Sequence, residues 1–320
     1  AVDRPPEPPA PVANEPFTLP PLPSLPSYLP RLRIQSLTVS SLELGVPILG
    51  QAASFTLDGR AGTGADGQTA TAELHARRID GPAASLDLGA TLGLPDTTLR
   101  LDLTGSETGG LLAAATGRPD AGDLDLALRG EGPLADWRGR LDLDAQNLVR
   151  IGLALRLGYG ERKQLGLDGT ADLAQGLLPP GLVDALGTRA ELALAAAETG
   201  PGRFGLEHLA LRAAGLSLTG EGSADLGSDR LSGDVTLAVP DLAPFSGLAT
   251  TPLAGNATAK LTAGGSLHRP TLHLALDGAD LRAAEAALGR LTAAVDLAVT
   301  APLGQGPFAA SAHGQALAEG

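Results

Sequence analysis

Histidines and acidic residues are the side chains of this sequence that could bind a metal ion or transfer a proton. The five histidines are His75, His208, His268, His273 and His313, and none of them lies at a metal-ligand spacing from another. His268 and His273 are five residues apart, so on one continuous strand they face opposite sides. We therefore expect all five histidines to lie on the surface.

The motifs that usually mark catalytic sites are absent from the sequence. It contains no Gly-x-Ser-x-Gly elbow, no His-Glu-x-x-His motif and no paired-carboxylate cleft. The Gly-Glu-Gly stretches at 130–132 and 220–222 are interpreted as turns before strands, which excludes phosphate loops before helices. Asp142 and Asp144 share a face, but only as two of many outward-facing acids. The sequence predicts a protein that is not an enzyme and that uses no metal or cofactor.

The dominant feature of the sequence is the alternation of apolar and polar residues. Successive side chains of a strand point to opposite faces, so this period of two gives each strand one apolar face and one polar face. Turn residues recur about every 8–14 positions, which indicates mostly antiparallel strands. Strands are expected at 31–39, 52–60, 70–79, 83–93, 97–104, 122–130, 137–147, 149–159, 188–197, 203–212, 215–225, 230–239, 254–263, 270–277, 290–300 and 307–317. A few weaker segments bring the expected number to about twenty.

Three interruptions of this rhythm have their own interpretation. Residues 177–187 predict a brief helical turn or cap, and residues 240–252 break the alternation. Residues 280–290 carry both a helical and a strand signal, with Asp280 and Gly289 as possible helix ends. The neighbouring rhythm favours a strand there.

Shifts in the alternation predict a curved sheet. The apolar parity changes at Ser36 and again at Ser40 and Ser41, and such a shift turns an apolar face outward unless the strand bulges or bends. The fold class expected is therefore all-β, an elongated, curled and mostly antiparallel sheet with an apolar concave face. Residues 31–320 are expected to form one repetitive segment of this kind.

Composition supports a thin structure and excludes one class of partner. The chain has 23 Lys and Arg against 36 Asp and Glu, a net charge of −13, and lacks the clustered basic surface that nucleic-acid binding requires. Its 320 residues include only five Phe, two Tyr and one Trp, although aromatic rings supply much of a thick core. No apolar stretch reaches 18 residues, so no membrane-spanning helix is expected. The absence of Met, including at position 1, suggests an internal piece of a longer protein.

Residues 1–30 contain 11 of the 25 prolines and are expected to form an extended connector. A proline-rich recognition motif is the alternative for this segment.

Four stretches share an order of phrases and a rhythm rather than a strict motif, and they are residues 37–61, 130–148, 231–261 and 264–281. In this they resemble the TamB-like family, the inner-membrane component of the translocation and assembly module within the AsmA-like group. The resemblance implies an elongated β-groove in the periplasm, anchored to the inner membrane by a segment absent from this piece. It also implies an outer-membrane barrel partner that binds through another absent region.

For function, the resemblance implies that phospholipid acyl chains pass between the inner and outer membranes along the apolar groove, in support of outer-membrane biogenesis. Two alternatives are a scaffold or chaperone for outer-membrane protein assembly and a structural β-solenoid without lipid transport. The residues expected to line the groove share parity within their strands. They are Leu124, Leu126, Leu128, Leu141, Leu143, Ile151, Leu153, Leu155, Leu157, Val235, Leu237, Val239, Leu272, Leu274, Leu276, Val295, Leu297 and Val299.

Overall fold

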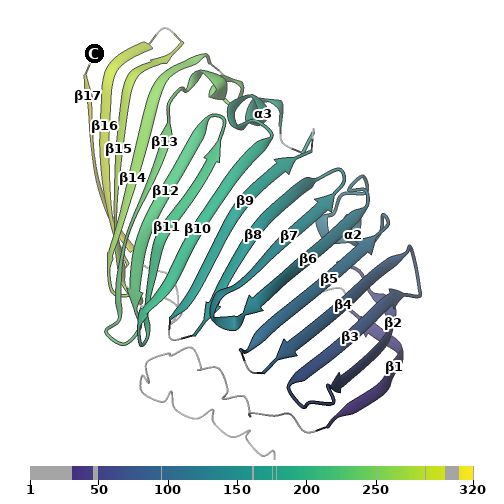
Figure 1. Cartoon of the computed structure of the whole chain (residues 1–320). Helices are drawn as coiled ribbons and strands as arrows, with labels where there is room; N and C mark the ends of the chain where they lie inside the picture. Colours follow the sequence, from purple (N-terminus) through teal and green to yellow (C-terminus); the bar gives the residue numbers. More distant parts are fainter. Residues whose placement is uncertain are drawn as a thin grey trace, which may run out of the picture.

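The computed structural model describes residues 31–45, 50–94, 96–160, 162–174, 176–177, 179–249, 251–284, 286–299 and 310–319. These residues form a single sheet of seventeen strands with two short α-helices and two 3₁₀ helices (Figure 1). The all-β fold class predicted from the alternation is confirmed. The connector expected at 1–30 lies outside the described residues.

The strands are β1 (Arg33–Leu44), β2 (Ala53–Thr63), β3 (Thr69–Arg78), β4 (Ala84–Gly93), β5 (Thr98–Glu107), β6 (Leu124–Pro133), β7 (Trp137–Ala145), β8 (Val149–Tyr159), β9 (Lys163–Leu173), β10 (Arg189–Gly200), β11 (Arg203–Ala213), β12 (Leu216–Asp225), β13 (Arg230–Val239), β14 (Leu253–Gly265), β15 (Pro270–Ala283), β16 (Ala286–Val299) and β17 (Ala310–Glu319). The helical elements are α2 (Leu111–Thr116), η1 (Leu134–Asp136), α3 (Pro180–Leu186) and η2 (Ala243–Gly247).

Each strand pairs antiparallel with the next strand along the chain, from β1 and β2 to β16 and β17. Within the described residues β1 and β17 do not pair with each other, so the sheet is not closed into a barrel. Figure 1 shows the resulting shape, in which the strands from β13 to β17 turn away from those at the β1 end. The sheet is therefore both elongated and curled.

Register shifts accompany the curl of the sheet. Between β1 and β2 the register slips between Ile34 and Leu37 and again between Val39 and Leu42, which are the places where the sequence predicted bulges. Further shifts lie between β10 and β11, between β11 and β12, and between β14 and β15. A bulge bends a strand and increases its twist while it restores the apolar parity.

The connections at one end of the strands carry the helices. At this end, α2 lies between β5 and β6, α3 between β9 and β10, and η2 between β13 and β14, and these longer connections alternate with short turns. We call this end of the sheet the helical rim. The opposite end, where β4 joins β5, β6 joins β7, β8 joins β9 and β10 joins β11, is called the turn rim, and η1 is its one helical element among the described residues.

Side chains from the helical elements fill the helical rim. Leu112 and Ala113 of α2 pack against a small buried cluster formed by Ala121, Ala145 and Leu148. At α3 and η2 the two backbones pack directly on each other, because a Cβ added at Gly181 would lie only 2.8 Å from the carbonyl carbon of Gly247. The helical turn predicted within 177–187 is confirmed as α3.

Three expectations from the sequence need correction. The described residues form seventeen strands rather than the expected twenty or so. The strand β9 (Lys163–Leu173) was missed because Gly169 and Ala171 weaken its apolar pattern. The Gly-Glu-Gly stretches are not turns, since they lie inside β6 and β12. At 280–290 the strand interpretation holds, with β15 extending to Ala283 and β16 beginning at Ala286.

Candidate functional site: an apolar groove with a pocket at its turn rim

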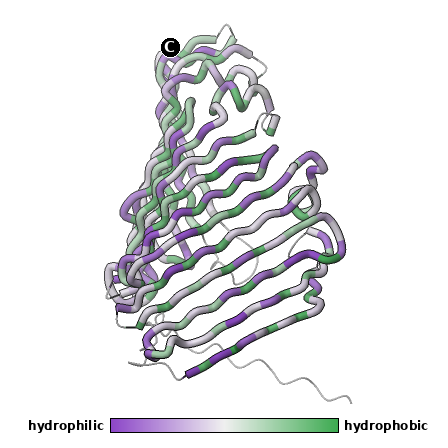
Figure 2. Tube along the Cα trace, turned by 45° about the vertical axis from the view of Figure 1, so that its right-hand side comes forward, coloured by the Kyte–Doolittle hydropathy of each residue, from purple (hydrophilic) through white to green (hydrophobic). Residues whose placement is uncertain are grey.

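The register of the sheet places the predicted lining residues on one face. In the first half of the sheet, Leu126 lies opposite Leu143, which lies opposite Ile151. The line continues across the middle of the sheet from Leu153 through Gly169, Leu192, Leu211 and Leu218 to Leu237. At the far end, Val235 is connected through Leu261 to Leu274 and Val295. All eighteen residues therefore belong to one continuous apolar face (the groove face), and Figure 2 shows the alternating hydropathy along the strands that produces it.

The groove face is not the interior of a closed core. None of the eighteen residues is buried: sixteen are half-buried, and Leu157 and Leu274 are 43% and 36% exposed. Among the described residues nine hydrophobic side chains are buried, and six of these are alanines. A closed sandwich would bury the large apolar side chains of both facing sheets instead. The groove face is thus accessible to an apolar ligand.

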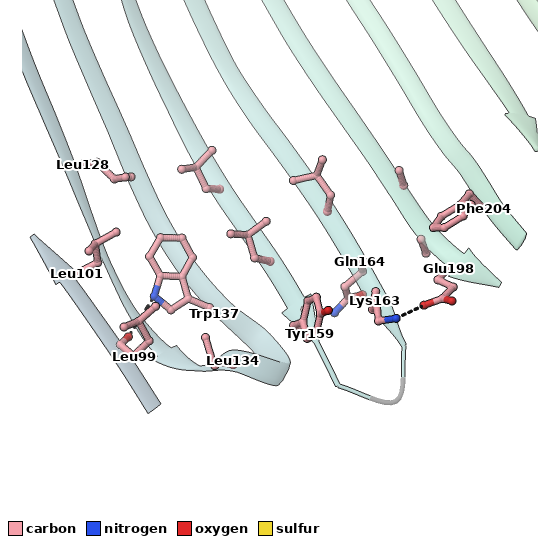
Figure 3. A pocket seen from close by; sticks show the side chains of 16 residues that line it. Leu99, Leu101, Leu128, Leu134, Trp137, Tyr159, Lys163, Gln164, Glu198 and Phe204 are labelled. Atoms are coloured by element: carbon pink, nitrogen blue, oxygen red, sulfur yellow. Dashed lines mark hydrogen bonds and ion pairs between the residues drawn. The ribbon is translucent and has the colours of Figure 1, made fainter. Parts of the chain in front are cut away.

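The groove face is hollowed into a pocket near the turn rim. The pocket has a volume of about 640 Å³, which is within the range of small-molecule binding sites. Its walls come from β5 to β11 (Figure 3). The lining includes Leu99, Leu101, Leu128, Leu134, Trp137, Leu155, Leu157, Tyr159, Lys163, Leu165, Ala196, Glu198 and Phe204.

Trp137 forms one wall of the pocket and is held firmly. Its side chain is 3% exposed, and its indole Nε1 donates a hydrogen bond of 3.1 Å to the carbonyl oxygen of Leu99. Gly130 and Gly139 make room for the ring, since a Cβ added at either would lie within 2.5 Å of a ring carbon of Trp137. The glycines in β6 and β7 therefore serve the packing of this one indole.

The opposite wall of the pocket carries an ion pair. Lys163 Nζ lies 3.1 Å from Glu198 Oε2, and the two side chains are only 15% and 12% exposed. Lys163 Nζ also lies 5.5 Å from the centroid of the Tyr159 ring, a cation–π distance. Figure 3 shows this pair beside Tyr159 and Phe204, with Trp137 across the pocket. Aromatic rings and a sheltered pair of opposite charges thus meet at the rim of an otherwise apolar groove.

The other face of the sheet is polar and carries exposed ion pairs. Arg60 with Glu73, Arg140 with Asp142, and Arg290 with Asp277 are three of them, each pair with its side chains 40% exposed or more. Such pairs contribute little stability individually but keep the face hydrated. The structure therefore separates an acidic, wet face from the groove face.

Several carboxyl groups of the polar face have a lowered pKa. Hydrogen bonds from His75 and Arg77 lower the pKa of Asp87, and those from Arg138 and Arg156 lower the pKa of Asp136. For Asp234 the hydrogen bond from the Thr262 hydroxyl is the main cause of a lowered pKa. These carboxylates are held ionised by partners that stabilise the polar face.

The five histidines lie on the surface as predicted. All of them are exposed, and His75, His268 and His273 each contact an aspartate. No group of three or more metal-ligating side chains is brought together within the described residues. Asp142 and Asp144 lie on the polar face, where Arg140 and Arg150 contact them.

Reasoning from the sequence missed the pocket cluster of Trp137, Tyr159, Lys163, Glu198 and Phe204. A signal for it was present, because Tyr159 has the parity of Leu155 and Leu157, and Lys163 has that of Leu165. An aromatic or charged residue on the lining parity of an aromatic-poor chain is the pattern that would have found it.

Comparisons of the chain with family models, with curated proteins and with solved structures find no match. Among the described residues no helix combines the length and the apolar character that crossing a membrane requires.

Proposed function

We propose that this chain is a segment of a TamB-like bridge that carries phospholipids across the periplasm, with their acyl chains in the groove. The observation that supports it is a continuous groove face along which none of the eighteen predicted lining residues is buried. The proposal includes no chemical step, because the groove binds and passes its ligand unchanged.

The energetics of lipid transfer favour this use of the groove. Burial of one CH₂ is worth about 0.8 kcal/mol, so moving a 16-carbon chain into water costs on the order of 10 kcal/mol. A continuous lining of Leu, Val, Ile and Ala removes most of this barrier. Because β1 and β17 do not pair within the described residues, the groove has an open side, where the polar headgroup stays in water while the acyl chains remain covered.

The substitution Leu155→Asp tests this function. Leu155 lies on the groove face in the pocket, and an acyl chain cannot solvate the carboxylate placed there. Its matched control is Ala154→Asp, which puts the same charge on the exposed polar face one residue away. We expect both variants to fold, because each carboxylate can reach water, and only Leu155→Asp to lose lipid.

The measurement is lipid occupancy by native mass spectrometry, together with circular dichroism and thermal melting. A folded Leu155→Asp variant with the lipid load of the Ala154→Asp control would refute the conduit. Unfolding of Leu155→Asp alone would instead support a closed core, in which an unpaired charge destabilises by several kcal/mol.

A scaffold for β-strands is a second candidate, favoured by the edges of the sheet. Within the described residues β17 pairs only with β16, and its side chains from Ser311 to Glu319 are exposed. Such an edge can accept an added strand. A proline at a polar-face position of β17 whose N–H points away from β16 would disrupt strand addition at this edge and leave lipid occupancy unchanged, so the two functions respond to different variants.

A further inference from the structure

The Lys163–Glu198 pair differs from the ion pairs of the polar face in its surroundings. Its side chains are 15% and 12% exposed, whereas Arg290 and Asp277 on the polar face are 60% and 47% exposed. Lys163 follows the lining parity of β9, and Glu198 follows that of β10, opposite Phe204. A lysine and a glutamate therefore stand on the groove face itself, where nearly every other residue is apolar.

The position of the ion pair in the groove predicts how an amphiphile bound in the pocket is oriented. Leu155, Leu157 and Leu165 line the pocket on the side of the sheet interior, while the turn between β8 and β9 lies at the turn rim. The opposite, helical rim is filled by α2, α3 and η2, and no such filling by an α-helix exists at the turn rim within the described residues. An amphiphile in the pocket then has its chains among the leucines and its polar end at the turn rim, beside Lys163 and Glu198.

We propose that this pocket is a selective headgroup-binding site (the headgroup site) for a two-chain amphiphile. The headgroup it prefers joins a phosphate diester to a primary ammonium group. The phosphate binds Lys163 and the ammonium binds Glu198. This inference rests on the proposed function, and it specifies the chemical class of lipid that the groove accepts best.

Charge balance selects a zwitterionic headgroup over an anionic one. A headgroup with a phosphate alone neutralises Lys163 but leaves Glu198 beside an anion, in surroundings where few water molecules reach it. A headgroup with both charges offers Lys163 a phosphate in place of Glu198 and offers Glu198 an ammonium in place of Lys163, so neither residue is left without an opposite charge. Reduced exposure strengthens both contacts relative to the same contacts in water.

Tyr159 and Phe204 complete the headgroup site. The Tyr159 ring lies under the Lys163 ammonium, and rings with a polar side suit the boundary between acyl chains and water. Trp137 closes the other wall and is fixed by its hydrogen bond to Leu99. The walls are thus shaped before the ligand enters, which lowers the cost of binding.

The test loads the 320-residue chain from an equimolar mixture of phosphatidylethanolamine and phosphatidylglycerol with identical acyl chains, and counts each bound lipid by native mass spectrometry. For the natural sequence we expect phosphatidylethanolamine to exceed phosphatidylglycerol about five- to tenfold, which corresponds to the net effect of about one hydrogen bond gained by the ammonium at Glu198. The double variant Lys163→Gln/Glu198→Gln is expected to lose bound phosphatidylethanolamine until the ratio of the two lipids is near one.

Two further variants keep the result interpretable. Arg290→Gln/Asp277→Asn removes an ion pair from the polar face and is expected to leave the ratio unchanged. Glu198→Gln retains Lys163 alone and is expected to shift the preference to the anionic phosphatidylglycerol, which decides the matter if the double variant does not fold.

An equal load of the two lipids on the natural sequence would overturn the headgroup site and leave the proposed function standing. An unchanged ratio in folded Lys163→Gln/Glu198→Gln or in folded Glu198→Gln would do the same. Absence of both lipids from the natural sequence would overturn the proposed function itself. The two failures are therefore distinguishable in one experiment.

Discussion

Trp137 and the glycines beside it form the tightest packing in the wall of the pocket. A Cβ at Gly130 would lie 2.1 Å from Cζ2 of the indole and 2.7 Å from the carbonyl oxygen of Arg138. Neither neighbour yields easily, because the ring is rigid and hydrogen-bonded and the carbonyl belongs to the adjacent strand. The size of residue 130 is thus fixed by a neighbour that the sequence places seven positions away.

We predict that Gly130→Ala destabilises the protein by about 1–3 kcal/mol, the usual cost of overpacking. Gly89→Ala is the matched control, because the nearest atom to its added Cβ is a carbonyl oxygen at 3.9 Å. Urea unfolding followed by the fluorescence of Trp137, the one tryptophan of the chain, measures both. Equal midpoints for the two variants would show that the indole does not fill this space.

The lowered pKa values of the polar-face aspartates predict how stability depends on pH. The carboxyl groups of Asp87, Asp136 and Asp234 have a lower pKa in the folded protein than their ordinary value of 3.8. Their contribution to stability is therefore complete above this ordinary pKa and is lost as the pH falls through the lowered values.

Near neutral pH we expect these groups to leave the melting temperature unchanged. When the pH drops below about 4, their protonation is expected to lower the melting temperature. The triple variant Asp87→Asn, Asp136→Asn and Asp234→Asn should show a shallower fall, measured by thermal melting between pH 7 and 2.5. An acid limb as steep as that of the natural protein would mean that other carboxylates dominate.

At the residue scale, parity predicted which apolar residues share one face of the sheet but not the ion pair in the pocket. Leu153, Leu155 and Leu157 could be assigned to one face because alternation within a single strand is local information. The contact of Lys163 with Glu198 depends on the pairing of β9 with β10. No period within one strand reports which residue of the next strand lies beside it.

The short helix α2 shows how a connection is attached to the groove face. The Glu107 carboxylate accepts hydrogen bonds from the backbone N–H groups of Gly110, Leu111 and Leu112, and Glu107 itself is 4% exposed. These N–H groups have no partner within a helix, so the glutamate acts as the cap. The cap fixes Leu112 where it packs on the buried cluster at the helical rim.

We predict that Glu107→Ala costs about 1–2 kcal/mol of stability, the usual effect of losing an N-cap, and that the amides of residues 110–116 lose protection from hydrogen exchange. Glu131→Ala in the neighbouring strand is the control, since Glu131 is exposed and has only a distant contact of 3.8 Å with Arg100. Unchanged exchange in α2 of the Glu107→Ala variant would contradict the capping role.

At the element scale, alternation located strands with strong leucine patterns and failed where small residues carry the pattern. The missed strand β9 places Gly169 on the lining parity, and a Cβ there would lie 2.0 Å from the carbonyl oxygen of Gly152. The close approach of two strands requires a glycine, and the same glycine removes the apolar signal. The glycine at 130 was mistaken for a turn for the same physical reason, because its role is to admit Trp137.

The whole molecule combines one continuous face with two different rims. Helices fill the helical rim, and the aromatic and charged cluster lies at the turn rim. Although the sheet is curled, β1 and β17 do not pair with each other in the described residues. The bulges that the sequence predicted in the first strand accompany this curl, whereas the side on which the helices lie could not be derived from the period of the strands.

The continuity of the groove face leads to a prediction for the entire sheet. If lipids pass along it, an acyl chain spends time at every strand, and not only in the pocket between β5 and β11. A photo-crosslinking amino acid placed at Leu88 in β4, Leu194 in β10 or Leu297 in β16 should therefore form a covalent adduct with bound lipid. The neighbours Asp87, Ala193 and Asp296 face the other side of the sheet and should give none.

The pattern of adducts, read by mass spectrometry after irradiation of the lipid-loaded chain, separates three arrangements. Adducts at all three groove positions mean a conduit, because the apolar surface that lowers the cost of burying a methylene is the same at each strand. Adducts at Leu194 alone, the position nearest to the pocket, mean a static binding site on an otherwise unused face. Equal adducts at Leu88 and Asp87 would mean that lipid adheres to both faces, and then the separation of a wet face from an apolar face would not govern where the lipid goes.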